Sequence, residues 1–188
     1  MINPMPQTAI SRVRKIISGI KPMDELEQIQ INDSLAWIDS GSPIFRIARP
    51  NIPDKHLVSY FIIFDNEALK VLLVDHKLSG LWLPTGGHVE FDENPLETVQ
   101  RECLEELQIK AEFWREDPIF LTSTITVGLT AGHTDVSLWY VLKGHHQINY
   151  NFDPQEFNSI RWFDPDEIPY EQSDPNMKRF ISKLWNLL

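Results

Sequence analysis

Three glutamates lie close together in the middle of the chain, at Glu102, Glu105 and Glu106. Spacings of three and four residues place side chains next to one another on a helix. Two like charges about 4 Å apart repel by about 4 kcal/mol at an effective dielectric constant near 20. Such carboxylates therefore either bind a cation or have raised pKa values. Hard oxygen ligands favour Mg²⁺, with Mn²⁺ as a substitute, and Mg²⁺ commonly bridges carboxylates to substrate phosphates.

The alternative interpretation of these glutamates is a solvated acidic helix face, which is common in a chain with a net charge of −10. Their surroundings favour the metal site. Gly86 and Gly87 are predicted to form a loop shortly before the helix, where a glycine lets the main chain approach a ligand closely. Arg101 directly precedes Glu102 and can hold a carboxylate through a bidentate pair.

A helix is predicted from Pro95 onward, and it positions the acids. Asn94 is a good N-cap, Pro95 fits the first helical position, and Glu97 falls where a capping-box acid reaches back. An apolar stripe at helical spacing follows, formed by Leu96, Val99, Cys103 and Leu107. Cys103 is therefore expected to be a small core residue rather than a reactive thiol.

Residues 87–109 resemble the Nudix box, which reads Gly, five residues, Glu, seven residues, Arg-Glu, an aliphatic residue, any residue, Glu-Glu, any residue, Gly and an aliphatic residue. The matching positions are Gly87, Glu93, Arg101, Glu102, Glu105, Glu106 and Ile109, with Cys103 as an apolar substitute. Gln108 stands where the family has a glycine that ends the helix in the left-handed conformation. A non-glycine residue there costs about 1 kcal/mol. This departure concerns the end of the helix and not the ligands.

The resemblance implies a Mg²⁺-dependent hydrolase that cleaves the pyrophosphate bond of a nucleoside diphosphate linked to another moiety, by attack of water on phosphorus. A nucleoside triphosphate, ADP-ribose and a nucleotide sugar are alternative substrates, and the sequence does not choose between them. A non-catalytic nucleotide-sensing module with a Nudix-like fold is the alternative from another class. Such a module would be expected to lose box glutamates, and this chain retains them.

The resemblance also implies roles for the box residues. The expected metal ligands are Glu102, Glu105, Glu106, the main-chain carbonyl of Gly87 and, as an additional ligand, Glu90. Glu93 is expected to pair with Arg101, and this pair would orient the ligands. The general base is either Glu102 or Glu105, whichever the metal holds less tightly.

Acids outside the box are further candidates for the site. Asp153 and Glu156, in the loop 143–157, could touch the metal or the attacking water, although both are more often ordinary loop acids. His145 and His146 have no third ligand at a suitable spacing, so no zinc site is predicted there.

The residues predicted to contact the substrate lie around the box, and they are Trp82, Gly86, Gly87, His88 and His133. Trp82 could stack on a base, but core packing is the favoured alternative. For His88 the alternative is a solvated loop, and for His133 a structural histidine near the start of a strand that also carries Asp135.

Composition limits the remaining function classes. A net charge of −10 and a pI near 5.0 argue against non-specific nucleic-acid binding and against an anionic membrane surface, because both need a basic field. The single cysteine excludes an internal disulfide framework and favours the cytoplasm. No apolar run is long enough to span a membrane. The expected partner is a small-molecule nucleotide, and the sequence is compatible with a homodimer.

The whole pattern predicts an α/β fold. Residues 1–50 read as a helical N-terminal extension, with helices over 7–19 and 22–40, and 51–188 as the Nudix domain. Strands are expected at 56–65, 68–75, 81–84, 120–127, 134–142 and 159–163, and a final helix is expected to begin with Asp174 as its cap and Pro175 in its first position. Strands interleaved with core helices indicate an α/β/α sandwich around a mixed sheet, as the Nudix resemblance implies.

Overall fold

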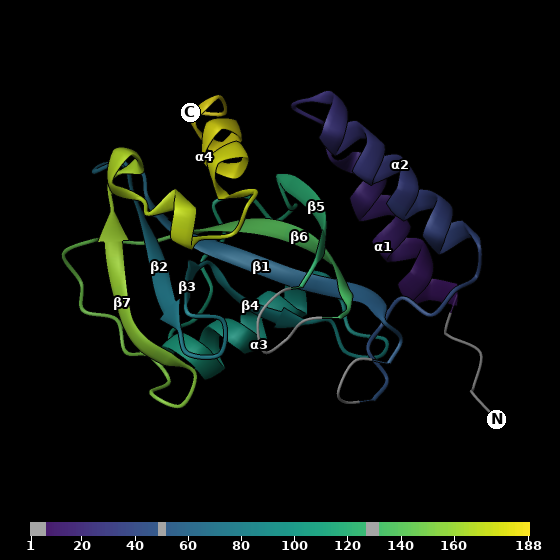
Figure 1. Ribbon diagram of the computed structural model, residues 1–188, viewed down its shortest axis with the longest axis horizontal. Coiled ribbons are helices and arrows are strands. Elements are labelled where there is room, and N and C mark those ends of the chain that lie inside the picture. Colours follow the sequence, from purple (N-terminus) through teal and green to yellow (C-terminus); the bar gives the residue numbers. More distant parts are fainter. Residues whose placement is uncertain (1–6, 49–51, 127–131) are drawn as a thin grey trace.

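The computed structural model describes residues 7–48, 52–126 and 132–188. Within them, seven strands form one mixed sheet with helices on both faces (Figure 1). The strand order is β3-β2-β1-β6-β5, with β4 paired to β1 and β7 paired to β2. The predicted α/β/α sandwich with a helical N-terminal region is confirmed.

The elements follow the predicted order closely. The helices are α1 (Gln7–Gly19), α2 (Glu25–Asp39), α3 (Pro95–Leu107) and α4 (Met177–Trp185), with short 3₁₀ turns at Pro165–Glu167 and Tyr170–Gln172. The strands are β1 (Lys55–Asp65), β2 (Lys70–His76), β3 (Leu81–Leu83), β4 (Thr85–His88), β5 (Phe120–Ile125), β6 (Thr134–Lys143) and β7 (Phe157–Phe163). The end of the strand predicted at 120–127 lies outside the described residues.

Strand β1 is the centre of the sheet. It runs parallel to β6 along its length, from the pair Lys55–Thr134 to the pair Phe64–Lys143. Its other edge is shared, because β4 pairs with residues 58–61 and β2 pairs with residues 63–65. The glycine stretch predicted as a loop is therefore largely a strand, bound by its main chain to the middle of the sheet.

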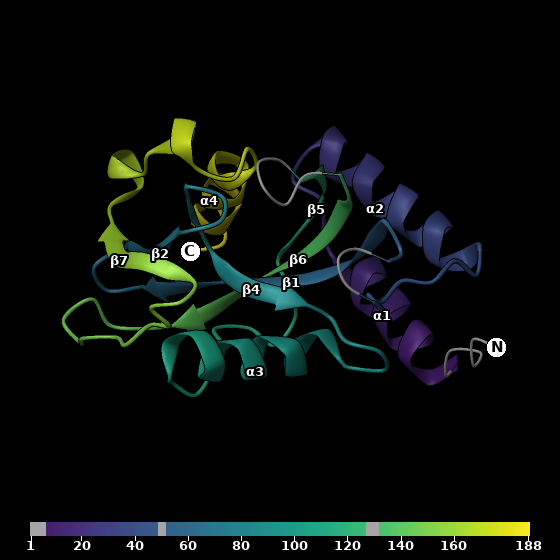
Figure 2. The same ribbon diagram turned by 60° about the horizontal axis from the view of Figure 1, so that its bottom comes forward.

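Two apolar cores fill the sandwich, one on each face of the sheet. On one face Val99, Cys103 and Leu107 of α3 pack in the same cluster as α1 and α2. On the other face α4 packs through residues such as Phe180 on Trp139 of β6. Figure 2 shows α3 and α4 on opposite sides of the sheet. Cys103 is fully buried, as predicted.

The N-terminal helices are joined to the C-terminal helix by buried charge. Glu27 of α2 is fully buried and accepts a hydrogen bond of 2.6 Å from Lys183 Nζ of α4. Its carboxylate also accepts the main-chain N–H of Leu121 at 3.3 Å. Arg179 of α4 binds Asp24, the N-cap of α2, at 2.6 Å. No helix in the described part of the chain is long and apolar enough to cross a membrane.

Two helix starts differ from the prediction. Helix α2 begins at Glu25 with Asp24 as its N-cap, and not at Pro22. Helix α4 begins at Met177, so the assignment of Asp174 as its cap was wrong. The Asp174 carboxylate instead accepts the N–H of Asn176 at 2.7 Å. This local bond forms a turn that delays the helix by two residues.

Candidate active site

Helix α3 is fixed at both ends. Glu97 accepts the Asn94 N–H at 3.1 Å, and the Asn94 side chain accepts the Leu96 N–H at 3.2 Å, so the predicted capping box is present. Ser59 of β1 donates to the carbonyl oxygen of Pro95 at 2.9 Å and holds the start of the helix on the sheet. Gln108 ends the helix in the left-handed region, with φ 56° and ψ 30°. The residue in the glycine position thus adopts the conformation that glycine would adopt.

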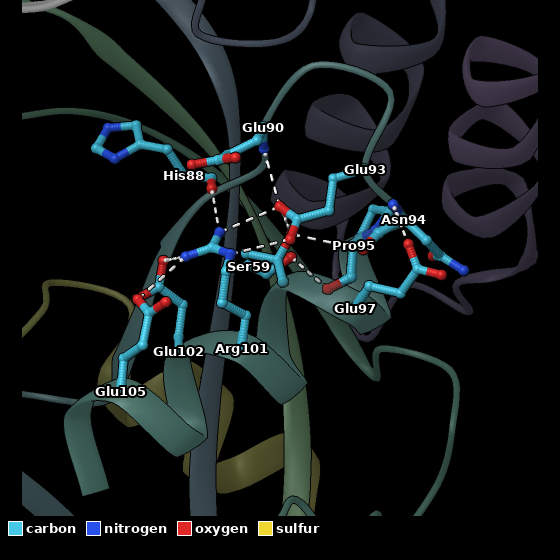
Figure 3. A network of polar contacts seen from close by, with 11 residues as sticks. Ser59, His88, Glu90, Glu93, Asn94, Pro95, Glu97, Arg101, Glu102 and Glu105 are labelled. Atoms are coloured by element: carbon cyan, nitrogen blue, oxygen red, sulfur yellow. Dashed lines mark hydrogen bonds and ion pairs between the residues drawn. The ribbon is translucent and has the colours of Figure 1, made fainter. Parts of the chain in front are cut away.

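Arg101 is the centre of the polar network on this helix (Figure 3). Its guanidinium binds both oxygens of Glu93, at 3.0 and 3.1 Å, and Glu102 at 2.6 Å. It also donates to the carbonyl oxygen of His88 at 3.2 Å and lies 3.5 Å from Glu105. One cation therefore orients two box glutamates and the main chain of the glycine strand.

Glu93 is held as an anion by this arrangement. Burial opposes its ionisation, but the hydrogen bonds from Arg101, Glu90 and Thr98 outweigh burial and lower its pKa. The hydrogen bond to Glu93, together with the charge of Glu102, raises the pKa of Arg101.

Glu106 is the most buried of the box acids, with 6% of the residue exposed. Its carboxylate accepts the N–H of Gly86 at 3.1 Å. Burial, followed by the charges of Glu102 and Glu156, raises its pKa well above the ordinary value. Burial also raises the pKa of Glu102, against the effect of Arg101.

Glu156 contacts Glu106 from outside the box. Its charge and its side-chain contact both raise the pKa of Glu106. Glu156 lies in the segment before β7, and its neighbour Asp153 donates its main-chain N–H to the carbonyl oxygen of Glu106 at 2.8 Å. Of the two loop acids named from the sequence, Glu156 is the one whose side chain meets the box.

The two glycines are required by close approach. A Cβ on Gly86 would lie 2.1 Å from the carbonyl oxygen of Ser59, and Gly86 also has φ 141°. A Cβ on Gly87 would lie 1.9 Å from Glu102 Oε1. The Glu102 carboxylate therefore rests directly on the backbone of Gly87, the residue whose carbonyl was predicted to bind metal.

The other predicted site residues are distributed around this centre. Glu105 is more exposed than Glu102, with 60% of its side chain accessible to solvent against 14% for Glu102. Glu90 is exposed and donates its N–H to Glu93 at 3.0 Å. Trp82 packs edge-on against Phe163 at 5.1 Å between ring centroids, which favours the core alternative over stacking on a base.

His88 and His133 do not join the acid network with their side chains. They lie beside His56 and Asp135, and each of these four residues offers one ligand atom within 4.8 Å of the others. Burial, and then the charge of Arg46, lower the pKa of His88 to about 3. His56 was missed because its sequence context, at the start of an apolar strand, carries no spacing signal toward the other three residues.

Among known protein families, the family model of the NUDIX domain matches residues 55–184, which is most of the chain. The chain belongs to the Nudix family. It is accordingly a hydrolase of the pyrophosphohydrolase class, and the box identified from the sequence is the family's defining segment. No curated protein sequence matches it.

Solved structures share the fold at low sequence identity. A MutT Nudix hydrolase from Burkholderia pseudomallei is 18% identical, with a TM-score of 0.53 over 68% of this chain and 96% of its own. The E. coli dihydroneopterin triphosphate pyrophosphohydrolase is 14% identical, with a TM-score of 0.56 over 78% and 100%. A C. elegans Ap4A hydrolase is 16% identical, with a TM-score of 0.53 over 69% and 96%. These matches support the fold of this Nudix protein and do not choose a substrate.

Proposed function

We propose that this Nudix protein is a Mg²⁺-dependent enzyme that hydrolyses the pyrophosphate bond of a nucleoside diphosphate linked to another moiety. The observation that carries the proposal is the approach of the half-buried Glu102 and the exposed Glu156 to the buried Glu106, with the pKa values of Glu102 and Glu106 raised. Buried carboxylates that repel one another are stabilised by a cation placed among them.

The donor set fits magnesium. All the candidate ligands are oxygens, namely the carboxylates of Glu102, Glu105, Glu106 and Glu90 and the carbonyl of Gly87, and hard oxygen donors suit Mg²⁺ or Mn²⁺. Burial and the charges of Glu102 and Glu156 favour the protonated form of Glu106, since they raise its pKa. A divalent ion bound among these carboxylates would offset their repulsion and favour the ionised form.

The protein's own groups divide the work. Glu102 uses one oxygen for Arg101 and Glu106 uses one for Gly86, and each retains a second oxygen for the ion. A bound Mg²⁺ would offset the charge of the pyrophosphate and lower the pKa of a water molecule. Glu105 is more exposed and less tightly bound than Glu102, so it is our candidate for the general base that accepts the proton from that water. Arg101 and Glu93 act as positioning residues.

The partner in this proposal is a small nucleotide, and the substrate class contains nucleoside triphosphates, ADP-ribose and nucleotide sugars. Two of the similar enzymes are named for dihydroneopterin triphosphate and Ap4A, which agrees with a pyrophosphate bond as the reacting group. Cys103 is buried, and burial raises the pKa of its thiol to about 12, which supports a structural role in a reducing cytoplasm.

The experiment is a turnover screen with Mg²⁺ against a panel of nucleoside diphosphate derivatives, followed by Glu106→Gln. Glutamine keeps an acceptor for the Gly86 N–H and removes the charge, so turnover should fall to background in a folded protein. Glu97→Gln is the matched control, because Glu97 lies on the same helix, outside the acid cluster, and should retain wild-type turnover. Products separate the substrates: pyrophosphate marks a triphosphate, whereas AMP with ribose phosphate marks ADP-ribose.

Wild-type turnover in the Glu106→Gln variant would contradict the ligand assignment. A wild-type protein that binds nucleotides but cleaves none of them would instead indicate the sensing module.

A further inference from the structure

A second group of side chains that could bind a metal lies at the end of β4, the strand that contains Gly86 and Gly87. His56 comes from the start of β1, His88 from the end of β4, Asp135 from the start of β6, and His133 directly precedes β6. One ligand atom of each lies within 4.8 Å of the others. His56 is fully buried, and 5% of His133 is exposed. Nothing in the proposed hydrolysis uses this group.

Buried polar atoms in this group have no hydrogen-bond partner among the described residues. They are His56 Nε2, His88 Nε2 and Asp135 Oδ1. An unpaired buried polar atom costs free energy, so three that face one another indicate a missing ligand.

The hydrogen bonding of His56 shows which ring nitrogen carries a lone pair. His56 Nδ1 lies 2.8 Å from the carbonyl oxygen of Pro53. A carbonyl can only accept, so Nδ1 carries the hydrogen and Nε2 of the neutral ring carries a lone pair. That lone pair lies 3.3 Å from Asp135 Oδ1, another acceptor. A cation between them removes the repulsion.

His133 repeats the arrangement. Its Nδ1 lies 3.0 Å from Thr126 Oγ1, and the same hydroxyl donates to the carbonyl oxygen of His133 at 3.2 Å. Nδ1 is then the donor to Oγ1, and Nε2 carries a lone pair 3.1 Å from Asp135 Oδ1. In both histidines Nδ1 thus donates to an oxygen of the protein, the bond by which metal-binding histidines fix the ring and its tautomer.

Strand register holds the group in place. His56 and Asp135 are direct partners in the parallel β1–β6 pair, and His88 is opposite Val58 on the other edge of β1. Side chains two residues apart on a strand share a face, so the three strands present these groups to one point.

We propose that His56, His88, His133 and Asp135 form a zinc site, separate from the acidic Mg²⁺ site and structural in role. Zinc binds imidazole nitrogen and carboxylate oxygen at about 2.0–2.2 Å in a tetrahedron, whose ligand atoms are then about 3.3 Å apart. The distances of 3.3 and 3.1 Å from Asp135 to the two histidines match that edge. Imidazole ligands also distinguish this site from the all-oxygen acid cluster.

Four protein ligands leave no open position, which is typical of structural zinc. The ion would join β1, β4 and β6, and its ligand His88 directly follows Gly87 in the sequence. His88 also lines a cavity of about 340 Å³ with Arg46 and Phe91, which gives the ion a route from solvent.

The test is the metal content and zinc affinity of the full chain, purified without a histidine tag or chelator. We expect about one zinc per chain, and, after zinc is removed and replaced by Co²⁺, the strong visible absorption of four-coordinate cobalt. His133→Gln and Asp135→Asn should each weaken zinc binding at least 100-fold. Thr126→Val leaves all four ligands in place, removes the hydroxyl that orients His133 and should weaken zinc binding about 10- to 100-fold.

Two controls locate the ion. His145→Gln removes an exposed histidine outside the group, 62% of whose side chain is exposed, and should bind zinc as the wild type does. Glu106→Gln should also retain zinc, since it alters the acid cluster alone. Should His133→Gln fail to fold, the cobalt spectrum and the Thr126→Val affinity still decide. The proposal is overturned if the wild-type chain takes up no stoichiometric zinc, or if Glu106→Gln loses zinc while His133→Gln and Thr126→Val keep it.

Discussion

At the scale of single residues, the site combines one cation with several acids, of which Glu106 is buried. Arg101 binds Glu93 and Glu102, while Glu106 lies among acids whose charges raise its pKa. The types and spacing of the box residues made the cluster predictable, because helical geometry places i, i+3 and i+4 together. Glu156 could not be placed in this way, because its approach depends on the sheet and not on local spacing.

Glu106→Gln is expected to stabilise the metal-free protein at pH 7. A carboxyl whose pKa is raised on folding costs stability above its unfolded pKa of 4.5, because the unfolded chain ionises freely there. Removing the charge should raise the Tm by about 2–4 °C, for about 1 kcal/mol, and the gain should vanish below pH 4.5. Thermal unfolding in EDTA measures it, with the exposed Glu116→Gln as control; an equal gain at pH 4 would contradict the cause.

Arg101→Lys is expected to impair magnesium binding while the protein stays folded. An ammonium group cannot reproduce the bidentate pair with Glu93 and still bind Glu102 and the His88 carbonyl. Magnesium affinity should fall about 10- to 100-fold, as is usual when the groups that orient metal ligands are lost. Calorimetric Mg²⁺ titration measures it, and Arg115→Lys, a surface change, should leave the affinity unaltered.

At the scale of elements, α3 was predictable almost to the residue and β4 was not. Caps and apolar period are local properties of residues 94–108, so they define the helix without reference to the rest of the fold. A strand of four residues with two glycines carries almost no propensity signal. This strand forms because it pairs with the edge of β1, and that pairing depends on the folded sheet and not on the local sequence.

Gln108→Gly is expected to stabilise the protein by about 1 kcal/mol, because glycine adopts the left-handed conformation at the helix end without steric cost. The lost contact between Asn151 and Gln108, at 3.3 Å, is exposed and should offset little. Urea unfolding checks the gain as a higher midpoint with an unchanged slope. Gln108→Ala retains the strain and should show no such gain; equal gains from both would point to the unfolded state.

At the scale of the whole molecule, the segment before the catalytic domain is part of one body with it. The family match begins at residue 55, yet α1 and α2 share an apolar cluster with α3, and α2 is bound to α4 through Glu27 and Lys183. The sequence predicted both helices but gave no indication of their partner. The pair joins residues 156 positions apart, and only the tertiary fold brings them together.

Glu27→Ala is expected to destabilise the protein by about 3–5 kcal/mol, because it leaves Lys183 buried without its partner. Burial already lowers the pKa of Lys183 against the effect of Glu27. The double variant Glu27→Ala with Lys183→Met should recover part of the loss, since neither charge then remains. Urea unfolding of the single and double variants measures the coupling. Glu25→Ala, an exposed change in the same helix, should stay within about 0.5 kcal/mol of the wild type.

The division of one β1 edge between β2 and β4 also affects how this enzyme can diversify. The main chain at Gly86 and Gly87, beside the proposed metal site, belongs to the ladder of the central strand, so insertions there would break the sheet. Changes in substrate range are therefore expected to accumulate in peripheral connections such as the segment 145–152, which ends before Asp153 and Glu156 and where length can vary without loss of strand pairing. Loop grafting at that segment, with 85–88 left intact, is the natural first route to altered specificity.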